Sequence, residues 1–235
     1  MLINFDVFKG SLKNVNLDTV RVINTINPHS YCVSKKDKEF QIALKDSDIL
    51  LPDGVGIVWA ERMLHGNKIS KIAGYDLFLF LMERANTLHQ KVFFLGASQA
   101  TLDLIHAKAA AEYPNVTVGS FSPPYKPIFS EEDSALMRAK ANAFEPDILF
   151  VGMTAPKQEK WVHTNKEQLN AKVIGSIGAV FDFYAGTVKR PSKFWINLGL
   201  EWLPRLVKEP KRLFKRNFVS TPTFIFDVFR AKFKL

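Results

Sequence analysis

Residues 92–118, VFFLGASQATLDLIHAKAAAEYPNVTV, contain the pattern that decides the fold class. The apolar run at 92–95 and the β-branched run at 116–118 each predict a short strand, and residues 99–112 between them have helical composition. Two strands joined through a helix form a crossover unit, in which both strands run parallel in one sheet. This stretch therefore predicts an α/β fold with a parallel sheet.

The alternation of strands and helices extends along most of the chain. Further short apolar or β-branched runs predict strands at 19–25, 48–51, 148–151 and 173–174. Helical patterns predict helices at 54–64, 75–88, 131–143 and 156–169. With 235 residues, of which 47% are hydrophobic, the chain can build one large α/β domain, which we place at residues 1–195.

The C-terminal region, residues 196–235, differs from the rest in charge and composition. Residues 189–235 hold 12 Lys and Arg against 3 Asp and Glu, so they account for the whole net charge of +9. Such segregation predicts an anionic partner, either nucleic acid or acidic lipid. Residues 218–233 mix phenylalanine with basic residues, which is more typical of an interfacial membrane element than of a core helix. We therefore predict a basic, helical appendage that associates with an anionic membrane surface.

The sequence also suggests where the protein works. It has no apolar run of about 18 residues, the length that a bilayer-spanning helix needs, and its N-terminus lacks the basic region of a signal peptide. We expect a cytoplasmic protein, peripheral on the inner face of the cytoplasmic membrane. The apolar face of the appendage can drive self-association when no membrane is present, so a homo-oligomer is a further expectation.

The segment after the predicted strand at 48–51 supplies a candidate catalytic carboxylate. In an open parallel sheet, ligands bind at the carboxyl ends of strands, and Asp53 follows this strand between Pro52 and two glycines, Gly54 and Gly56. A carboxylate there can act as a general base, and glycines allow the backbone to approach a ligand. Taken alone, the segment favours a role for Asp53 as a helix cap over a role as a general base.

Two nearby aspartates form a D-x-D pattern, Asp46 and Asp48, which in other proteins can hold a divalent metal on a diphosphate. Because Asp48 opens a short buried strand, we expect these carboxylates at a helix end and a strand edge, and we predict no metal. The segment at 96–98 lacks the G-x-G-x-x-G and P-loop patterns. We predict no cofactor.

Three other segments place polar side chains after predicted strands. Thr25 and Asn27 end the first strand and either bind a ligand or cap the next helix. The turn after 148–151 combines one glycine with polar residues that can bind a diphosphate or a nucleobase, namely Gly152, Lys157, Gln158 and Glu159. Asp182 lies between aromatic residues and needs a partner or a ligand if it is buried.

Four segments together resemble the WecG/TagA/CpsF family of bacterial glycosyltransferases. They are PDGVGIVWA at 52–60, KIAGYDLF at 71–78, PDILFVGMTAPKQEKWV at 146–162, and IGAVFDFYAGTVKRPSKFWINLGLEWLPRLVKEPKR at 177–212. The resemblance implies a Rossmann-like fold without an obligatory metal and an inverting transferase at the cytoplasmic membrane face. It also implies a UDP-sugar donor, carrying N-acetylmannosamine, its uronic acid or another hexose. The implied acceptor is a polyprenyl-diphosphate-linked saccharide for cell-surface polysaccharides.

The resemblance also assigns roles to residues of this sequence. It implies that Asp53 is the general base, that Thr25 is a second catalytic residue, and that Asn27, Gly74 and Gln158 bind substrate. It further implies that cations of the appendage stabilise the leaving diphosphate, with Arg205, Arg212 and Arg216 as the candidates. Lys71 stands where many members have arginine, so a phosphate contact is retained with a point charge in place of a bidentate fork.

Two alternatives to a transferase remain at this stage. A nucleic-acid-binding protein would explain the basic, aromatic appendage, but it leaves the segments at 52–56 and 156–159 without a role. A non-catalytic nucleotide-sugar-binding protein can share the fold, because a fold does not determine an activity. The partners that we predict are therefore the donor, the acceptor and the membrane surface, without nucleic acid.

Overall fold

The computed structural model of the chain describes residues 3–19, 21–189, 191–192, 194–195, 202–203, 206 and 210–233, with the backbone alone at 211 and 212. Arg205, a predicted ligand of the diphosphate, lies outside the described residues.

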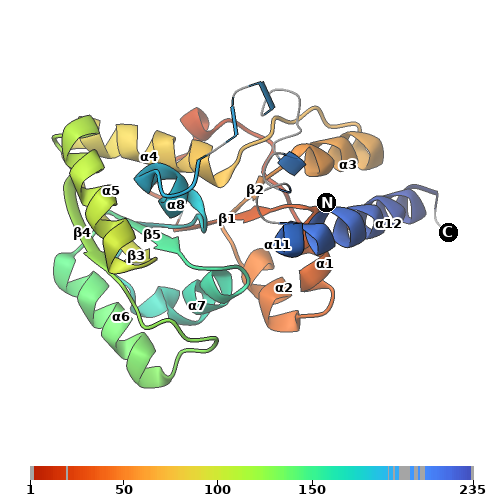
Figure 1. Cartoon of the computed structure of the whole chain (residues 1–235). Helices are drawn as coiled ribbons and strands as arrows, with labels where there is room; N and C mark the ends of the chain where they lie inside the picture. The colour runs from red at the N-terminus through yellow and green to blue at the C-terminus, as the bar shows by residue number, and fades with distance from the viewer. Residues whose placement is uncertain are drawn as a thin grey trace.

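The described residues form a six-stranded sheet in the order β2-β1-β6-β5-β3-β4, and all its strands run parallel (Figure 1). The strands are β1 Val22–Ile26, β2 Ile49–Pro52, β3 Lys91–Gly96, β4 Thr117–Phe121, β5 Ile148–Gly152 and β6 Val173–Ser176. The interior strands β3 and β5 pair with Phe93 opposite Leu149 and are buried along almost their whole length. Continuous apolar runs are expected for strands that are covered on both faces.

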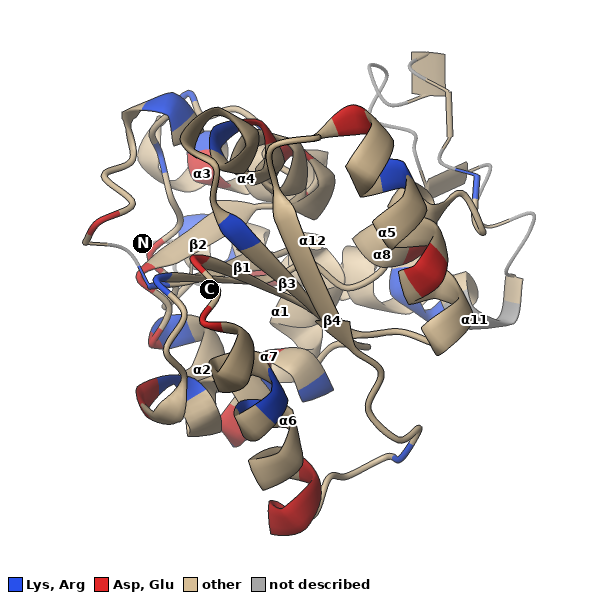
Figure 2. Cartoon of the chain, turned by 90° about the vertical axis from the view of Figure 1, so that its left-hand side faces the viewer, with Lys and Arg blue, Asp and Glu red and all other residues tan. Residues whose placement is uncertain are grey.

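Helices cover both faces of the sheet (Figure 1). On one face lie α4 (Gly74–Leu88), α5 (Gln99–Glu112) and α8 (Val180–Ala185), whose apolar side chains share one core cluster with β3 and β5. On the other face lie α2 (Lys38–Lys45), α6 (Glu131–Phe144) and α7 (Lys157–Asn165). Basic and acidic residues occur on the helices of both layers (Figure 2). The predicted Rossmann-like α/β fold is therefore confirmed.

A separate core cluster lies beside β1 and β2, where α1 (Pro28–Ser34), α3 (Val55–His65) and α12 (Thr221–Phe233) meet. The chain reaches α12 through α11 (Pro210–Phe214) and a π-helical turn, Lys215–Ser220. Phe224 and Val228 of α12 are fully buried, and the Phe224 ring packs edge-on against Tyr31 of α1 at 5.1 Å. One face of α12 is thus a core face, which corrects the expectation that residues 218–233 form a surface element alone.

The predicted elements agree with the structure apart from small shifts at their ends. The helix predicted at 156–169 ends earlier, because Asn165 is followed by a 3₁₀ turn, Lys166–Gln168. The helices α1, α2 and α8 were not predicted. Among the described residues, no helix combines the length and apolarity needed to cross a membrane.

Candidate active site

A cleft of about 1060 Å³ opens at the carboxyl ends of the strands. The cleft is lined by residues at the ends of β1, β3, β5 and β6 and by the segment after β2. The chain leaves β3 toward α5 on one face of the sheet and leaves β5 toward α7 on the other face (Figure 1). Between two such strands the connections diverge, and this divergence is what creates a ligand-binding crevice in open α/β sheets.

Most of the predicted site residues meet in this cleft. Its lining includes Thr25, Asn27, Asp53, Gly74, Gly152, Lys157, Gln158, Glu159, Asp182 and Arg216. Gly54, Gly56 and Lys71 are described but do not line it. For Arg212 only the backbone is described, within α11.

Gly56 has a packing role that the sequence did not reveal. A Cβ atom at this position would lie 2.8 Å from Cγ of Pro28 and 3.8 Å from the ring of Phe224. The glycine therefore allows α3 to pack closely against α1 and α12, because any side chain would displace one of them. The backbone approach at Gly56 serves neighbouring helices, and no ligand is needed to account for it.

Asp53 is held beside the end of β1. Its backbone N–H donates to the carbonyl oxygen of Ile26 at 2.9 Å, which continues the pairing of β1 and β2 by one residue. The side-chain oxygen of Asn27 accepts hydrogen bonds from the backbone N–H groups of His29 and Ser30, so Asn27 caps α1. Its amide Nδ2 then faces Asp53 and donates to Oδ2 at 3.4 Å. Asn27 thus fulfils the predicted cap and also orients the carboxylate.

The N-cap position of α3 is taken by Gly54, whose φ of +103° suits glycine. Asp53 is therefore one residue outside the helix and half-buried in the wall of the cleft. Thr25, also half-buried, lies in the same wall and pairs in register with Leu51.

Gln158 and Glu159 form a short chain of hydrogen bonds at the start of α7. Gln158 accepts from the backbone N–H of Met153 through Oε1 at 3.2 Å and donates through Nε2 to Oε1 of Glu159 at 2.9 Å. Glu159 is only 3% exposed, and its other oxygen, Oε2, has no hydrogen-bond partner among the described residues. Burial raises the pKa of Glu159 to about 7, and the hydrogen bond from Gln158 offsets part of this increase.

Lys157 points toward the segment that follows β4. Its ammonium donates to the carbonyl oxygen of Lys126 at 2.8 Å and lies 4.5 Å from the centre of the Phe129 ring. Burial lowers the pKa of Lys157. Lys157 therefore connects α7 to the wall of the cleft, a structural contact that the predicted binding of a diphosphate or a nucleobase did not include.

Asp182 and Arg216 line the cleft from later parts of the chain. Asp182, in the first turn of α8, is half-buried and accepts a hydrogen bond from the hydroxyl of Thr187 at 3.5 Å. Arg216 comes from the π-helical turn before α12 and faces the same cleft as His29. Burial lowers the pKa of His29, and the positive charges of Arg216 and Lys215 lower it further.

Sequence reasoning missed several residues of the lining. Ser176, the last residue of β6, is 1% exposed, lines the cleft, and has a hydroxyl without a partner among the described residues. Ser98 follows β3 and caps α5 by accepting from the backbone N–H of Thr101. The rule that ligands bind at strand ends would have found both serines, because each one ends or follows a strand.

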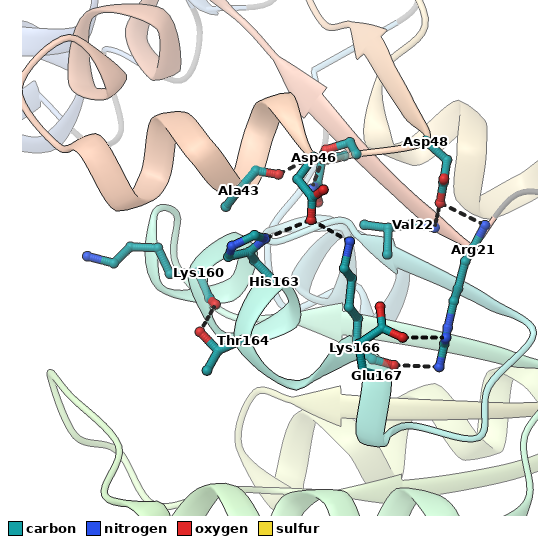
Figure 3. A network of polar contacts seen from close by, with 12 residues as sticks. Arg21, Val22, Ala43, Asp46, Asp48, Lys160, His163, Thr164, Lys166 and Glu167 are labelled. Carbon is teal, nitrogen blue, oxygen red and sulfur yellow. Dashed lines mark hydrogen bonds and ion pairs between the residues drawn. The ribbon is translucent and has the colours of Figure 1, made fainter.

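Neither carboxylate of the D-x-D pattern lines the cleft. Figure 3 shows Asp46 beside His163 and Lys166, and Asp48 beside Arg21 and Val22. Asp46 caps the end of α2, forms an ion pair with Lys166, and is hydrogen-bonded to Nδ1 of His163 at 2.9 Å. The hydrogen bond from Lys166 is the main reason why the pKa of Asp46 is lowered. Asp48 accepts from the backbone N–H groups of Arg21 and Val22 at the amino end of β1. The predicted helix-end and strand-edge roles are confirmed.

Comparison with known proteins shows to which family the chain belongs. The model of the glycosyl transferase WecG/TagA/CpsF family matches residues 6–235. The chain belongs to this family. It is therefore a glycosyltransferase, as the four sequence segments predicted.

Three curated relatives share one name, N-acetylglucosaminyldiphosphoundecaprenol N-acetyl-beta-D-mannosaminyltransferase. The relative from Bacillus subtilis (strain 168) is 33% identical over 211 residues, which cover 90% of this chain and 80% of the relative. The Bacillus spizizenii relative is 30% identical over 225 residues, with 95% and 85% covered. The relative from Staphylococcus aureus (strain MW2) is 29% identical over 235 residues, with 100% and 88% covered.

Proposed function

We propose that this enzyme transfers N-acetylmannosamine, or a sugar of that type, from a UDP-linked donor to a polyprenyl-diphosphate-linked N-acetylglucosamine. The product would serve the synthesis of a bacterial cell-surface polysaccharide. The names of the relatives support this choice of sugar and acceptor. The observation that carries the proposal is that Asp53 and Gln158 line one cleft at the carboxyl edge of the sheet.

In the proposed reaction, Asp53 accepts the proton of an acceptor hydroxyl. The hydroxyl oxygen forms a bond to the anomeric carbon of the donor, while the bond from that carbon to the diphosphate oxygen breaks on the opposite face. The electron pair of the broken bond leaves with the diphosphate, so the configuration inverts. The long hydrogen bond from Asn27 to Oδ2, at 3.4 Å, supports this role for Asp53, because it favours one orientation of the carboxylate before the acceptor binds.

The leaving diphosphate requires positive charge, which the cleft offers near the C-terminal segment. We assign this role to Arg216, which lines the cleft, and extend it to Arg205 and Arg212 on the family resemblance alone. The N-termini of α4 and α5 also face the carboxyl edge of the sheet, and helix N-termini favour anions. Gly74, Gly152 and Asp182 complete the lining that we assign to substrate binding, and Thr25, which also lines the cleft, is the second residue that we assign to catalysis.

The decisive test is turnover of the full chain with UDP-N-acetylmannosamine and a polyprenyl-diphosphate N-acetylglucosamine, followed by mass spectrometry of the lipid product. We expect the Asp53→Asn variant to lose about 10²- to 10⁴-fold in rate and to bind UDP as the unmodified enzyme does. Asp103→Asn, an exposed carboxylate on α5 that lies outside the cleft, is the matched control. Near-normal turnover by Asp53→Asn, or UDP binding without any transfer by the unmodified enzyme, would exclude the proposed reaction.

We also propose that the enzyme works on the inner face of the cytoplasmic membrane and binds it through α12. The face of α12 opposite Phe224 exposes Phe226, Phe229 and Phe233, the first of them at 66%. Phe229 lies 5.8 Å from the ring of Trp59 and stacks with Phe233 at 6.2 Å, so the aromatic side chains form one patch. Aromatic residues together with nearby basic side chains favour an anionic lipid surface.

A vesicle sedimentation assay tests the membrane proposal. Deleting the appendage would also remove Phe224 and Val228 from the core, so we prefer serine substitutions at the exposed positions Phe226, Phe229 and Phe233. The matched control replaces exposed leucines on other helices, Leu88, Leu104 and Leu136. We expect the phenylalanine variant to remain in the supernatant when anionic vesicles are sedimented, and the leucine variant to sediment with them. Equal sedimentation of both variants would contradict the proposal.

A further inference from the structure

Two buried polar atoms without partners belong to residues that line the cleft. Oε2 of Glu159 and the hydroxyl of Ser176 have no hydrogen-bond partner among the described residues, although their side chains are 3% and 1% exposed. Both residues line the cleft, Glu159 from α7 and Ser176 from the end of β6. A buried polar group without a partner is costly, and two of them in one cleft indicate that a ligand completes their hydrogen bonds.

The side chain of Gln158 connects the two positions. Its amide donates to Oε1 of Glu159, and the turn after Ser176 packs against the same amide. At Gly178 in this turn, a Cβ atom would lie 3.5 Å from Oε1 of Gln158. Because Oε1 of Gln158 also accepts from the backbone of Met153, both ends of the amide are engaged and its orientation is determined. Glu159 is therefore held through Oε1, and Oε2 is the oxygen that remains for a ligand.

The charges around Glu159 indicate that the diphosphate of the donor does not bind next to this carboxylate. No described Lys or Arg forms an ion pair with Glu159. The adjacent Lys160 pairs with Asp37 and Glu39, and Lys157 donates to the carbonyl of Lys126. A diphosphate next to a buried carboxylate without a counterion would be repelled. A hydroxyl or N–H group, in contrast, donates readily to a carboxylate oxygen.

We propose that Glu159 and Ser176 determine specificity by binding a neutral hydroxyl or N–H group of the nucleotide-sugar donor, remote from its diphosphate. The group belongs to the nucleoside or to the transferred sugar, and the inference rests on the function proposed above. Sites that hydrogen-bond a substrate hydroxyl or N–H reject analogues that lack it, because the buried partner is then left unsatisfied. Glu159 supplies the acceptor, and the hydroxyl of Ser176 adds a second donor or acceptor beside it.

Calorimetric titration of the full chain with UDP, UDP-N-acetylmannosamine and inorganic pyrophosphate tests this inference. The variants are Glu159→Gln, which keeps size and shape, and Ser176→Ala. The matched control is Glu167→Gln, an exposed carboxylate in the 3₁₀ turn after α7. We expect Glu159→Gln to weaken binding of the UDP-sugar roughly 10- to 100-fold and Ser176→Ala to weaken it roughly 2- to 10-fold. Pyrophosphate should bind both variants at least as tightly as the unmodified enzyme.

The three ligands separate the outcomes. If the bound group belongs to the nucleoside, UDP and the UDP-sugar lose affinity together; if it belongs to the sugar, only the UDP-sugar does. Unchanged UDP-sugar affinity in both variants overturns the inference and leaves the transferase proposal intact. Weaker pyrophosphate binding by Glu159→Gln overturns the assignment to a neutral group. Failure of the unmodified enzyme to bind either nucleotide overturns the UDP donor itself. Circular dichroism and thermal unfolding of each variant confirm that the binding changes are not caused by misfolding.

Discussion

Replacing Glu159 with glutamine also tests the energetic cost of the buried carboxyl group. Burial raises its pKa from 4.5 to about 7 in the folded protein. An acid whose pKa is raised by folding binds its proton more tightly in the native state, so the free energy of unfolding falls as the pH rises between these two values. A difference of about 2.5 pKa units at about 1.4 kcal/mol each corresponds to about 3 kcal/mol of lost stability above pH 7.

Glutamine at this position has no proton to lose and retains an oxygen for the amide of Gln158. The difference in unfolding free energy between Glu159→Gln and the unmodified enzyme should therefore grow by about 3 kcal/mol from about pH 4 to about pH 8, in favour of the variant. Other titrating groups cancel in this difference. Urea denaturation at each pH measures it, and Glu167→Gln, at an exposed position, should show no comparable trend. A pH-independent difference for Glu159→Gln would refute the reasoning, since the carboxyl would then have a partner that stabilises its charge.

Three further predictions concern packing and the C-terminal helix. Phe224→Ala should lower the free energy of unfolding by about 3–5 kcal/mol. Phe226→Ala, at an exposed position of the same helix, should change it by less than about 0.5 kcal/mol. Equal effects of the two substitutions in urea denaturation would contradict the assignment of the core face. Gly152→Ala would place a Cβ atom 2.5 Å from the ring of Phe181, and the overpacking should cost about 1–3 kcal/mol in the same assay; a neutral effect would mean that the ring can move away. Tyr31→Phe removes the hydrogen bond that the hydroxyl donates to Asp227 at 3.2 Å, and we expect a loss of about 1–3 kcal/mol, with Tyr125→Phe, fully exposed, as the control that should be neutral.

The fold could be predicted because its strongest signals are local. Strands β3 and β5 are covered on both faces and appear in the sequence as continuous apolar runs. The helix α1 was missed because PHSYCVS is short and polar, and its start depends on the side chain of Asn27, which caps it. A single capping residue is a weaker signal than the periodic pattern of a long helix.

The candidate site could be predicted in part for a topological reason. Parallel strands place their carboxyl ends at one edge of the sheet, so residues after several strands had to converge there, as Asp53 and Gln158 do. Gly56 was assigned to the ligand because a glycine near a strand end can serve either a ligand or a packing partner. The contacts that decide its role come from Pro28 and Phe224, and Phe224 is distant in the sequence.

The helix α1 connects the C-terminal segment to the carboxylate that we propose as the base. At its start, Asn27 donates to Asp53. Along its length, His29 lies 2.9 Å from the hydroxyl of Ser220, and Lys35 forms an ion pair with Asp227 at 2.6 Å. Displacing α12 would therefore leave α1 without these partners as well as without the core contact of Phe224. Because one face of α12 is needed for this packing, only its exposed aromatic face remains for a membrane, and a membrane-bound enzyme would keep Asn27 and Asp53 in the arrangement seen here.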